Sequence, residues 1–200
     1  DWRHAEEALR ASEARFRTFA DHATDAFFLH DEQLTVIDVN RQACASLGYR
    51  REELIGRDPR DFDADLDETS IARLADRVGA GETVTFETRH RRKDGGVFPV
   101  EIRVRQFQQG ERRFHVALAR DISERKRTEK RMLAQHTVAQ ILADAATVDD
   151  AMPRLLEAVC ECLDWDLGTF WRVDREAGVL RCARVWRKAF LDAADFETAT

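Results

Sequence analysis

Thiols and imidazoles are where chemistry would first be expected, because they bind metals and serve as nucleophiles or bases. The chain contains four cysteines, Cys44, Cys160, Cys162 and Cys182. Cys160 and Cys162 lie in a stretch that reads as a helix, where side chains two residues apart point to different sides. We therefore expect reduced, free thiols and no metal site.

Catalytic patterns are also missing from the sequence. A histidine kinase needs a phosphoacceptor histidine followed by Glu and later Pro, together with Gly-rich ATP loops. His136 is followed by Thr137 and Val138, and no such loop is present. Asp94-Gly95-Gly96 does not match the Gly-Gly-Asp/Glu-Glu-Phe signature of a diguanylate cyclase, and there is no G-x-S-x-G elbow. These observations predict that the chain itself is not an enzyme.

The charge pattern argues against nucleic acid and membrane partners. The formal net charge is -6, and the one basic run, at 89–93, has no interleaved aromatic residues. We expect that run to be a solvated turn, with His90 exposed to solvent. No apolar stretch reaches the ~18 residues of a membrane span, and the first residues do not resemble a signal peptide. We expect a cytoplasmic segment cut from a longer protein, whose membrane attachment elsewhere stays open.

The first twenty residues form an amphipathic pattern. Trp2, Leu9, Phe16 and Phe19 fall on one heptad stripe. The pattern predicts a helix at 1–20 that pairs with a second copy as a short coiled coil, which makes a homodimer. The alternative is a helix that packs on its own domain.

Strand patterns position the middle of the chain. Apolar runs and alternating residues predict strands at 27–30, 35–39, 83–92 and 97–104, and a last strand around Phe114, Val116 and Leu118. Asn40 is placed to cap a short helix that Gly48 ends, and 71–78 has a helical apolar face. The order predicts an α+β unit with five antiparallel strands and helices between the second and third.

At Asp121 the pattern becomes helical again. Asp121 can cap the new helix, and Glu124 lies three residues later, as in a capping box. This helix should run to about residue 146. A further helix and two strands, at 167–173 and 179–186, then follow.

These features together carry a family resemblance. The block 15–123 resembles a PAS domain of the sensory-box type, including its C-terminal PAC motif. The matching pieces are Asp25-Ala26-Phe27, Val39-Asn40, Leu47-Gly48-Tyr49-Arg50-Arg51-Glu52-Glu53-Leu54-Ile55-Gly56, Arg92-Lys93-Asp94-Gly95-Gly96 and Asp121-Ile122-Ser123-Glu124-Arg125. The segment 135–200 resembles the first part of a truncated GAF domain, through Leu163-Asp164-Trp165-Asp166-Leu167-Gly168 and Phe170-Trp171-Arg172-Val173-Asp174.

The resemblance implies a sensory input module of a bacterial signal-transduction protein. The module would sense a small ligand or relay conformational signals through the linker helix 124–146 to an output domain in the same parent chain. One alternative is that the parent protein is a sensor histidine kinase, or a diguanylate cyclase, and is defined by that activity. Another is that the PAS domain is a ligand-free dimerisation spacer.

Two sets of site residues follow from the resemblance. The pocket candidates are Phe27, Leu29, Val36, Ile55, Leu74 and Ile102, which could instead simply pack a core. The relay candidates are Asp121, Ile122 and Ser123, which could instead form an ordinary cap.

Neither of the large cofactors of PAS domains is expected here. Heme is disfavoured because 65–78 contains no histidine. Flavin photochemistry is disfavoured because Cys44 lies one helix too early. We predict no cofactor and leave an unidentified small ligand open.

Overall fold

The structure is a computed structural model that describes residues 2–189, apart from the side chains of Ala5 and Leu9. The chain divides into two compact units, Asp1–Ser123 and Glu124–Thr200. Each unit is described by itself.

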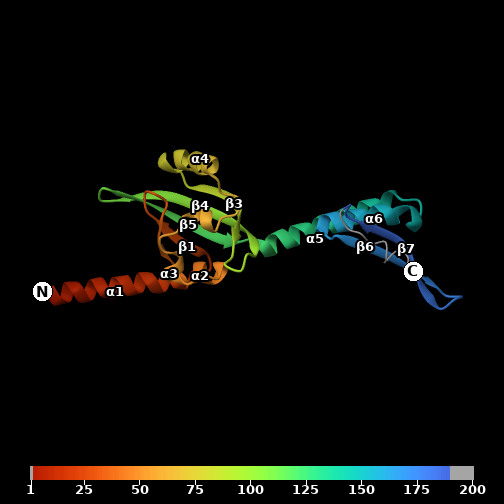
Figure 1. Ribbon diagram of the computed structural model, residues 1–200, viewed down its shortest axis with the longest axis horizontal. Helices are drawn as coiled ribbons and strands as arrows, with labels where there is room; N and C mark the ends of the chain where they lie inside the picture. Colours follow the sequence, from red (N-terminus) through yellow and green to blue (C-terminus); the bar gives the residue numbers. More distant parts are fainter. Residues whose placement is uncertain (1, 190–200) are drawn as a thin grey trace. The chain divides into compact units, whose positions relative to one another are not determined.

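The first unit contains a long helix, a five-stranded sheet and short helices (Figure 1). Its elements are α1 (Trp2–Asp21), β1 (Ala26–His30), β2 (Val36–Val39), α2 (Arg41–Leu47), α3 (Arg51–Leu54), the 3-10 helix η1 (Pro59–Asp61), α4 (Glu68–Gly79), β3 (Val84–Arg91), β4 (Val97–Gln109) and β5 (Arg112–Asp121). The strand order is β2-β1-β5-β4-β3, and every pair is antiparallel. The predicted α+β fold is confirmed.

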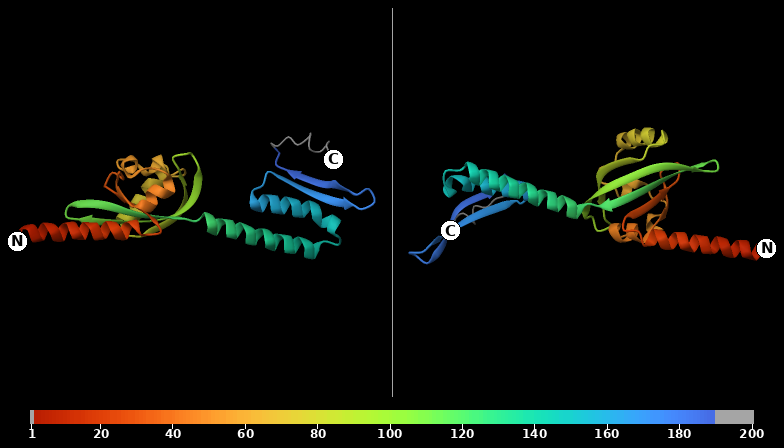
Figure 2. Two further views of the ribbon diagram at one scale, coloured as in Figure 1. Left: turned by 90° about the horizontal axis from the view of Figure 1, so that it is seen from below. Right: turned by 180° about the vertical axis from the view of Figure 1, so that it is seen from behind.

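Alternating burial explains why β3 and β4 pair in one register. Along β4, Phe98, Val100 and Ile102 are buried, while the residues between them are more exposed. A one-residue slip would turn this apolar set away from the core. The turn between the two strands contains Gly95 at φ 89°, a conformation that favours glycine. Beyond the core, β4 and β5 continue as a long hairpin (Figures 1 and 2).

Asn40 ties three elements together, and its predicted role as a helix cap is confirmed. Its Oδ1 accepts hydrogen bonds from the amides of Ala43 in α2 and Phe27 in β1, both at 2.9 Å. Its Nδ2 donates to the carbonyls of Ala20 (2.8 Å) and Asp25 (3.0 Å). At the other end of α2, Gly48 takes the left-handed conformation that stops the helix, as predicted.

The core lies between the sheet and the short helices. Buried residues of α2 and α3, such as Leu47 and Leu54, share one cluster with Phe28 of β1 and Val100 of β4. These helices therefore cover the same face of the sheet, next to β1 and β2. The α4 helix lies beside β3 and β4 (Figure 1).

The second unit begins within α5 (Ser123–Asp144) and continues with α6 (Val148–Leu163), β6 (Leu167–Asp174) and β7 (Val179–Arg187). The two strands form an antiparallel sheet of their own. Gly168 lets β6 approach α6 closely, because a Cβ atom there would lie 2.4 Å from Sγ of Cys160. Residues 190–200 of the expected GAF segment lie outside the described residues.

Candidate functional site

An apolar cavity of about 110 Å³ lies between the sheet and α4 in the first unit. Its polar lining residues are His30, Asp63, His90 and His115. Its apolar lining residues are Phe28, Leu34, Pro59, Phe62, Leu66, Ile71, Leu74, Ala75, Val78, Phe86, Ile102, Val104 and Ala117. A concave, largely apolar pocket with a few polar groups is the usual form of a small-molecule site.

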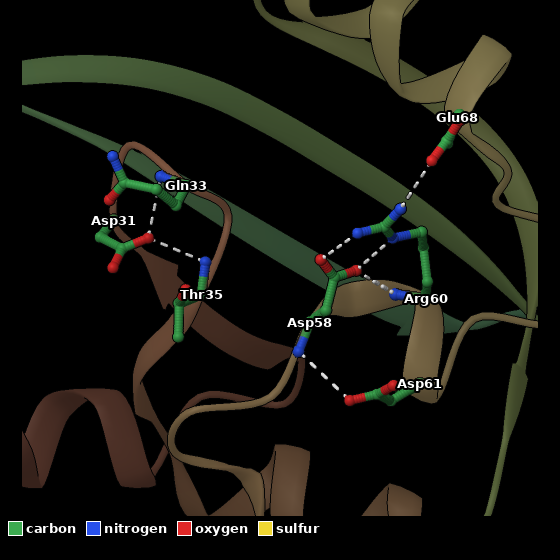
Figure 3. Close-up of polar contacts among 7 residues, drawn as sticks. All are labelled: Asp31, Gln33, Thr35, Asp58, Arg60, Asp61 and Glu68. Carbon is green, nitrogen blue, oxygen red and sulfur yellow. Dashed lines mark hydrogen bonds and ion pairs between the residues drawn. The ribbon is translucent and has the colours of Figure 1, made fainter.

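The loop between β1 and β2 holds one wall of the cavity. Oδ1 of Asp31 accepts hydrogen bonds from the amides of Gln33 (3.0 Å) and Thr35 (2.8 Å), as Figure 3 shows. This side-chain turn supports the positive φ of 66° at Leu34, which a non-glycine residue rarely adopts. The turn thereby fixes Leu34 in the cavity lining.

The η1 helix holds a second wall. Asp58 caps it by accepting a hydrogen bond from the Arg60 amide at 2.9 Å, and the Arg60 guanidinium binds the same carboxylate through two further hydrogen bonds, each 2.8 Å long (Figure 3). The Arg60 side chain lowers the pKa of Asp58. It also lies 3.7 Å from the carboxylate of Glu68 at the start of α4. These contacts fix Pro59 next to the cavity.

The prediction for His90 was wrong. The residue was expected to be exposed to solvent, but only 3% of its surface is exposed. Its ring lies edge-on to Phe28, Phe62 and Phe98, with centroids 6.1, 5.6 and 5.9 Å away. Burial lowers the pKa of His90 to about 4, so the ring is neutral at pH 7. The reason is strand alternation: Arg89 and Arg91 face solvent, so the residue between them faces the core.

A second buried histidine lies on β1. Burial is the largest cause that lowers the pKa of His30 to about 4. Its Nε2 atom has no hydrogen-bond partner among the described residues. Such an atom is unusual, because nearly all buried polar groups in native proteins are paired.

Two further polar residues of the cavity, Asp63 and His115, make hydrogen bonds. Oδ1 of Asp63 accepts hydrogen bonds from the hydroxyl of Thr88 (2.7 Å) and the amides of Asp65 and Leu66 (3.0 Å each). Burial raises the pKa of Asp63. Nδ1 of His115 lies 3.2 Å from the carbonyl of Asp31. Neither Asp63 nor His115 was predicted from the sequence, although strand alternation places His115 on the same face as Ala117.

Of the six pocket candidates, Leu74 and Ile102 line the cavity. Phe27 and Leu29 do not, because Ala26, Phe28 and His30 are the inward residues of β1. Phe27 pairs with Leu118 of β5, which is 37% exposed on the other face of the sheet.

The other two candidates lie outside the lining for different reasons. Val36 is fully buried in the core cluster rather than at the cavity. Ile55 follows α3 and is 38% exposed.

The three relay candidates form the turn between β5 and α5. The amide of Ser123, the first residue of α5, donates to Oδ1 of Asp121 at 2.8 Å. Oδ2 of Asp121 lies 3.8 Å from the guanidinium of Arg92. Ile122 is buried, and its amide donates to the carbonyl of Pro99 at 3.1 Å. The Asp121 carboxylate thus contacts the start of α5 and the loop after β3 at once.

A continuous series of contacts joins the cavity to this turn. The guanidinium of Arg92 lies 3.9 Å from the centroid of the Phe98 ring, a cation–π geometry. Phe98 contacts His90, which lines the cavity, and Arg92 contacts Asp121. Arg92 also donates to the carbonyl of Ser46 at the end of α2. From the sequence, Arg92 was noted as part of a basic run and of one piece that matches the PAS family, and no role in the relay was predicted for it.

The predicted dimer stripe on α1 is exposed. Trp2, Phe16 and Phe19 have 79%, 61% and 76% of their surfaces exposed. The side chain of Leu9 lies outside the described residues. Large apolar side chains that gather on an exposed surface are typical of an interaction site.

The thiols, possible metal ligands and helix lengths can be examined in residues 2–189, the part of the chain that the structure describes. Cys44, Cys160, Cys162 and Cys182 are free thiols. Within 2–189, no group of three His, Cys, Asp or Glu residues is arranged to hold a metal ion. Within the same residues, no helix has the length and apolar character needed to cross a bilayer. In the basic run, Arg89 pairs with Asp65 and Lys93 with Glu53.

Comparison with known proteins agrees with this geometry. The family model of the PAS domain matches residues 24–124, so the chain belongs to the PAS domain family. The PAS domain of an HTR-like protein from Haloarcula marismortui is 27% identical, with a TM-score of 0.56 over 60% of this chain and 99% of that chain.

Two curated relatives are similar in sequence. A methyl sulfide methyltransferase-associated sensor from Methanosarcina acetivorans is 29% identical over 126 residues, which cover 62% of this chain and 13% of that protein. An uncharacterized protein from Azorhizobium caulinodans is 35% identical over 127 residues, which cover 57% of this chain and 16% of that protein. The chain spans a small part of both relatives. Its PAS fold and the sensor among its relatives identify it as a sensory signal-transduction module.

Proposed function

We propose that the chain is a dimeric sensory input module in which an occupant of the PAS cavity alters the turn at Asp121, Ile122 and Ser123 and thereby α5. The observation that carries the proposal is the series of contacts His90–Phe98–Arg92–Asp121, which starts at the cavity wall and ends at the first amide of α5. A change in the position of the His90 ring would move each neighbour in turn, since packed side chains resist compression.

Two alanines on α4 provide a matched test. Ala75 lines the cavity, whereas Ala72, which is exposed as Ala75 is, does not. Ala75→Leu partly fills the cavity, as a ligand would, and Ala72→Leu makes the same chemical change outside it. We expect Ala75→Leu to change the hydrogen-exchange rate of the Ile122 and Ser123 amides, and Ala72→Leu to leave it unchanged.

The relay itself is tested by removing its cation. In an Ala75→Leu chain that also carries Arg92→Gln, we expect the exchange rates at the turn to become insensitive to the cavity. Equal effects of Ala75→Leu and Ala72→Leu would support the ligand-free spacer instead. If the Arg92→Gln chain still responds in full, the series of contacts through Arg92 is refuted as the route from the cavity to the turn.

The dimer part of the proposal is supported by the exposed stripe on α1. A second copy of the chain would cover Trp2, Phe16 and Phe19 in the manner of a short coiled coil. Analytical ultracentrifugation of the chain and of a Phe16→Glu, Phe19→Glu variant tests this. We expect the unmodified chain to sediment as a dimer and the variant as a monomer. If the unmodified chain also sediments as a monomer, the dimer is refuted.

For the parent protein, we propose a GAF domain that begins in the second unit and an output domain further along the chain. The helix–strand–strand order of α6, β6 and β7 supports the GAF proposal. A sensor histidine kinase is the favoured output, with a diguanylate cyclase second. Incubation of the full-length parent with labelled ATP tests the first choice, because a kinase labels its own histidine. The cytoplasmic location remains part of this proposal.

A further inference from the structure

A second hollow lies against the sheet, next to α2 and the turn between β5 and α5. It is an open cleft of about 280 Å³, and its lining includes Gln42 and Ser46 of α2, His90 of β3 and Asp121 of β5. We call it the turn cleft, because Asp121 belongs to that turn. His90 lines both the turn cleft and the cavity beside α4.

Three groups of the turn cleft lack a hydrogen bond within the part of the chain that the structure describes. The ring nitrogens of His90 make none, although only 3% of the residue is exposed. The side-chain amide of half-buried Gln42 also makes none. Oδ1 of Asp121 accepts from Ser123, but Oδ2 lies 3.8 Å from Arg92, beyond hydrogen-bond distance. A buried, unpaired ring is rare in native proteins, and a bound molecule would explain it.

The charges of the lining favour a cation. Arg120 donates to both carboxylate oxygens of Asp25, at 3.0 and 2.9 Å, so these two charges offset each other. The negative charge of Asp121 remains. His90 is neutral at pH 7, because burial lowers its pKa to about 4, and one of its ring nitrogens is therefore an acceptor. The Gln42 oxygen is also an acceptor, so all three unpaired groups can accept a hydrogen bond.

Arg92 already lies near Asp121, but its guanidinium is shared among three neighbours. It donates to the Ser46 carbonyl, and it lies 3.9 Å from the centroid of the Phe98 ring. The side chains of Arg92 and Asp121 are 34% and 42% exposed, so their ion pair is solvated and contributes little. A ligand cation that donates directly to Oδ2 of Asp121 would make a stronger, charge-assisted hydrogen bond.

We propose that the turn cleft is a second ligand site, which takes a compact organic ammonium ion at Asp121, Gln42 and His90 and displaces Arg92 from Asp121. An ammonium group has three donors and no acceptor, which matches the three acceptors of the cleft. The inference goes beyond the proposed sensing by the cavity beside α4. A ligand in the turn cleft would act at the start of α5 directly, without the series of contacts that begins at the cavity wall.

Three small probes test the proposal with the full chain: propylammonium, propionamide and propionate. Binding is followed at pH 7 by NMR, through the carboxylate carbon of Asp121 and the side-chain amide of Gln42. We expect propylammonium to bind about tenfold more tightly than propionamide, the ratio that one charge-assisted hydrogen bond provides. Propionate should shift neither signal. Added salt should reduce the preference for propylammonium, because Asp121 is partly exposed.

Matched variants locate the site. Asp121→Asn removes the charge and keeps an oxygen that can cap α5, so propylammonium should lose its advantage over propionamide. Asp38→Asn makes the same change in a carboxylate that pairs with Arg51 and does not line the cleft, and it should leave the advantage unchanged. Arg92→Gln removes the competing cation and should strengthen the binding of propylammonium several-fold.

The proposal is overturned if no probe binds, or if propionamide or propionate binds as well as propylammonium. It is also overturned if Asp38→Asn abolishes the preference, or if Arg92→Gln does not strengthen binding. If Asp121→Asn does not fold, the Asp121 carbon signal of the unmodified chain decides, and a signal that propylammonium leaves unshifted refutes the site. None of these results tests the relay from the cavity, which Ala75→Leu probes without an added ligand.

Discussion

The two sheets of the chain differ in how completely their strands are buried. In the first unit, β1 and β4 alternate between fully buried and more exposed residues, and short helices cover the buried face. In the second unit, no described residue of β6 or β7 is fully buried, and the buried residues are on the helices. A two-stranded sheet is marginal alone and depends on a helix that packs against it. The cavity therefore lies against a well-supported sheet, and the second sheet depends on α6.

The largest expected effect is the removal of a ring from the better-buried sheet. Phe28 is almost wholly buried and stacks on Phe62, with centroids 5.3 Å apart. We expect Phe28→Ala to lower the free energy of unfolding of the first unit by about 3–5 kcal/mol. Phe170→Ala in half-buried β6 should cost the second unit less, in proportion to the smaller area that Phe170 buries. Denaturant-dependent hydrogen exchange, which resolves the two units, measures both losses; equal losses would refute the comparison.

The next effect is a pH dependence of the first unit. His30 and His90 have pKa values near 4 when folded and about 6.5 when unfolded. Between these values the unfolded chain binds more protons, so the free energy of unfolding falls as the pH falls. Each histidine can contribute up to about 3 kcal/mol to this loss. The raised pKa of Asp63 acts in the opposite direction at the acidic end.

His90→Phe tests this pH dependence. Denaturation curves at pH 7 and pH 5 should show a smaller loss of stability in this variant than in the unmodified chain. The control is Phe62→Leu, which changes the same ring cluster without removing a titratable group and should lower stability equally at both values. An unchanged pH dependence in His90→Phe would mean that the imidazole is solvated.

A smaller effect concerns the contact that supports the second sheet. In Gly168→Ala, the new methyl group would collide with Cys160, so we expect a loss of about 1–3 kcal/mol, seen as faster hydrogen exchange in β6 and β7. Adding Cys160→Ala should restore much of the stability, since it removes the sulfur atom that is struck. Independent, additive effects of the two changes would show that the close approach is absent.

The sequence predicted the strands and caps of the first unit well, because their signals are local. The side chain of Asn40 can cap a helix, and Gly48 and Gly95 can adopt the positive φ that their positions require. The alternation of Phe98, Val100 and Ile102 likewise selects one face without knowledge of the partner strand.

The composition of the cavity could not be predicted in the same way. Ala26, Phe27, Phe28 and Leu29 are all apolar, so no alternation shows which pair faces inward. That choice depends on pairing with β5, a strand about 90 residues later in the chain. His90 was obscured by the charged residues around it, although the alternation of Val84, Phe86 and Thr88 on β3 could have placed it inside. Asp63 lies in a loop, where no periodicity applies.

The bonding of Asn40 has a consequence for substitution at that position. Its oxygen faces two amide hydrogens, and its nitrogen faces the carbonyl oxygens of Ala20 and Asp25. An aspartate of the same shape would set a negative oxygen against those carbonyls. The position therefore favours a carboxamide, and loss of that group would remove the hydrogen bond that joins Ala20 in the last turn of α1 to the end of β2.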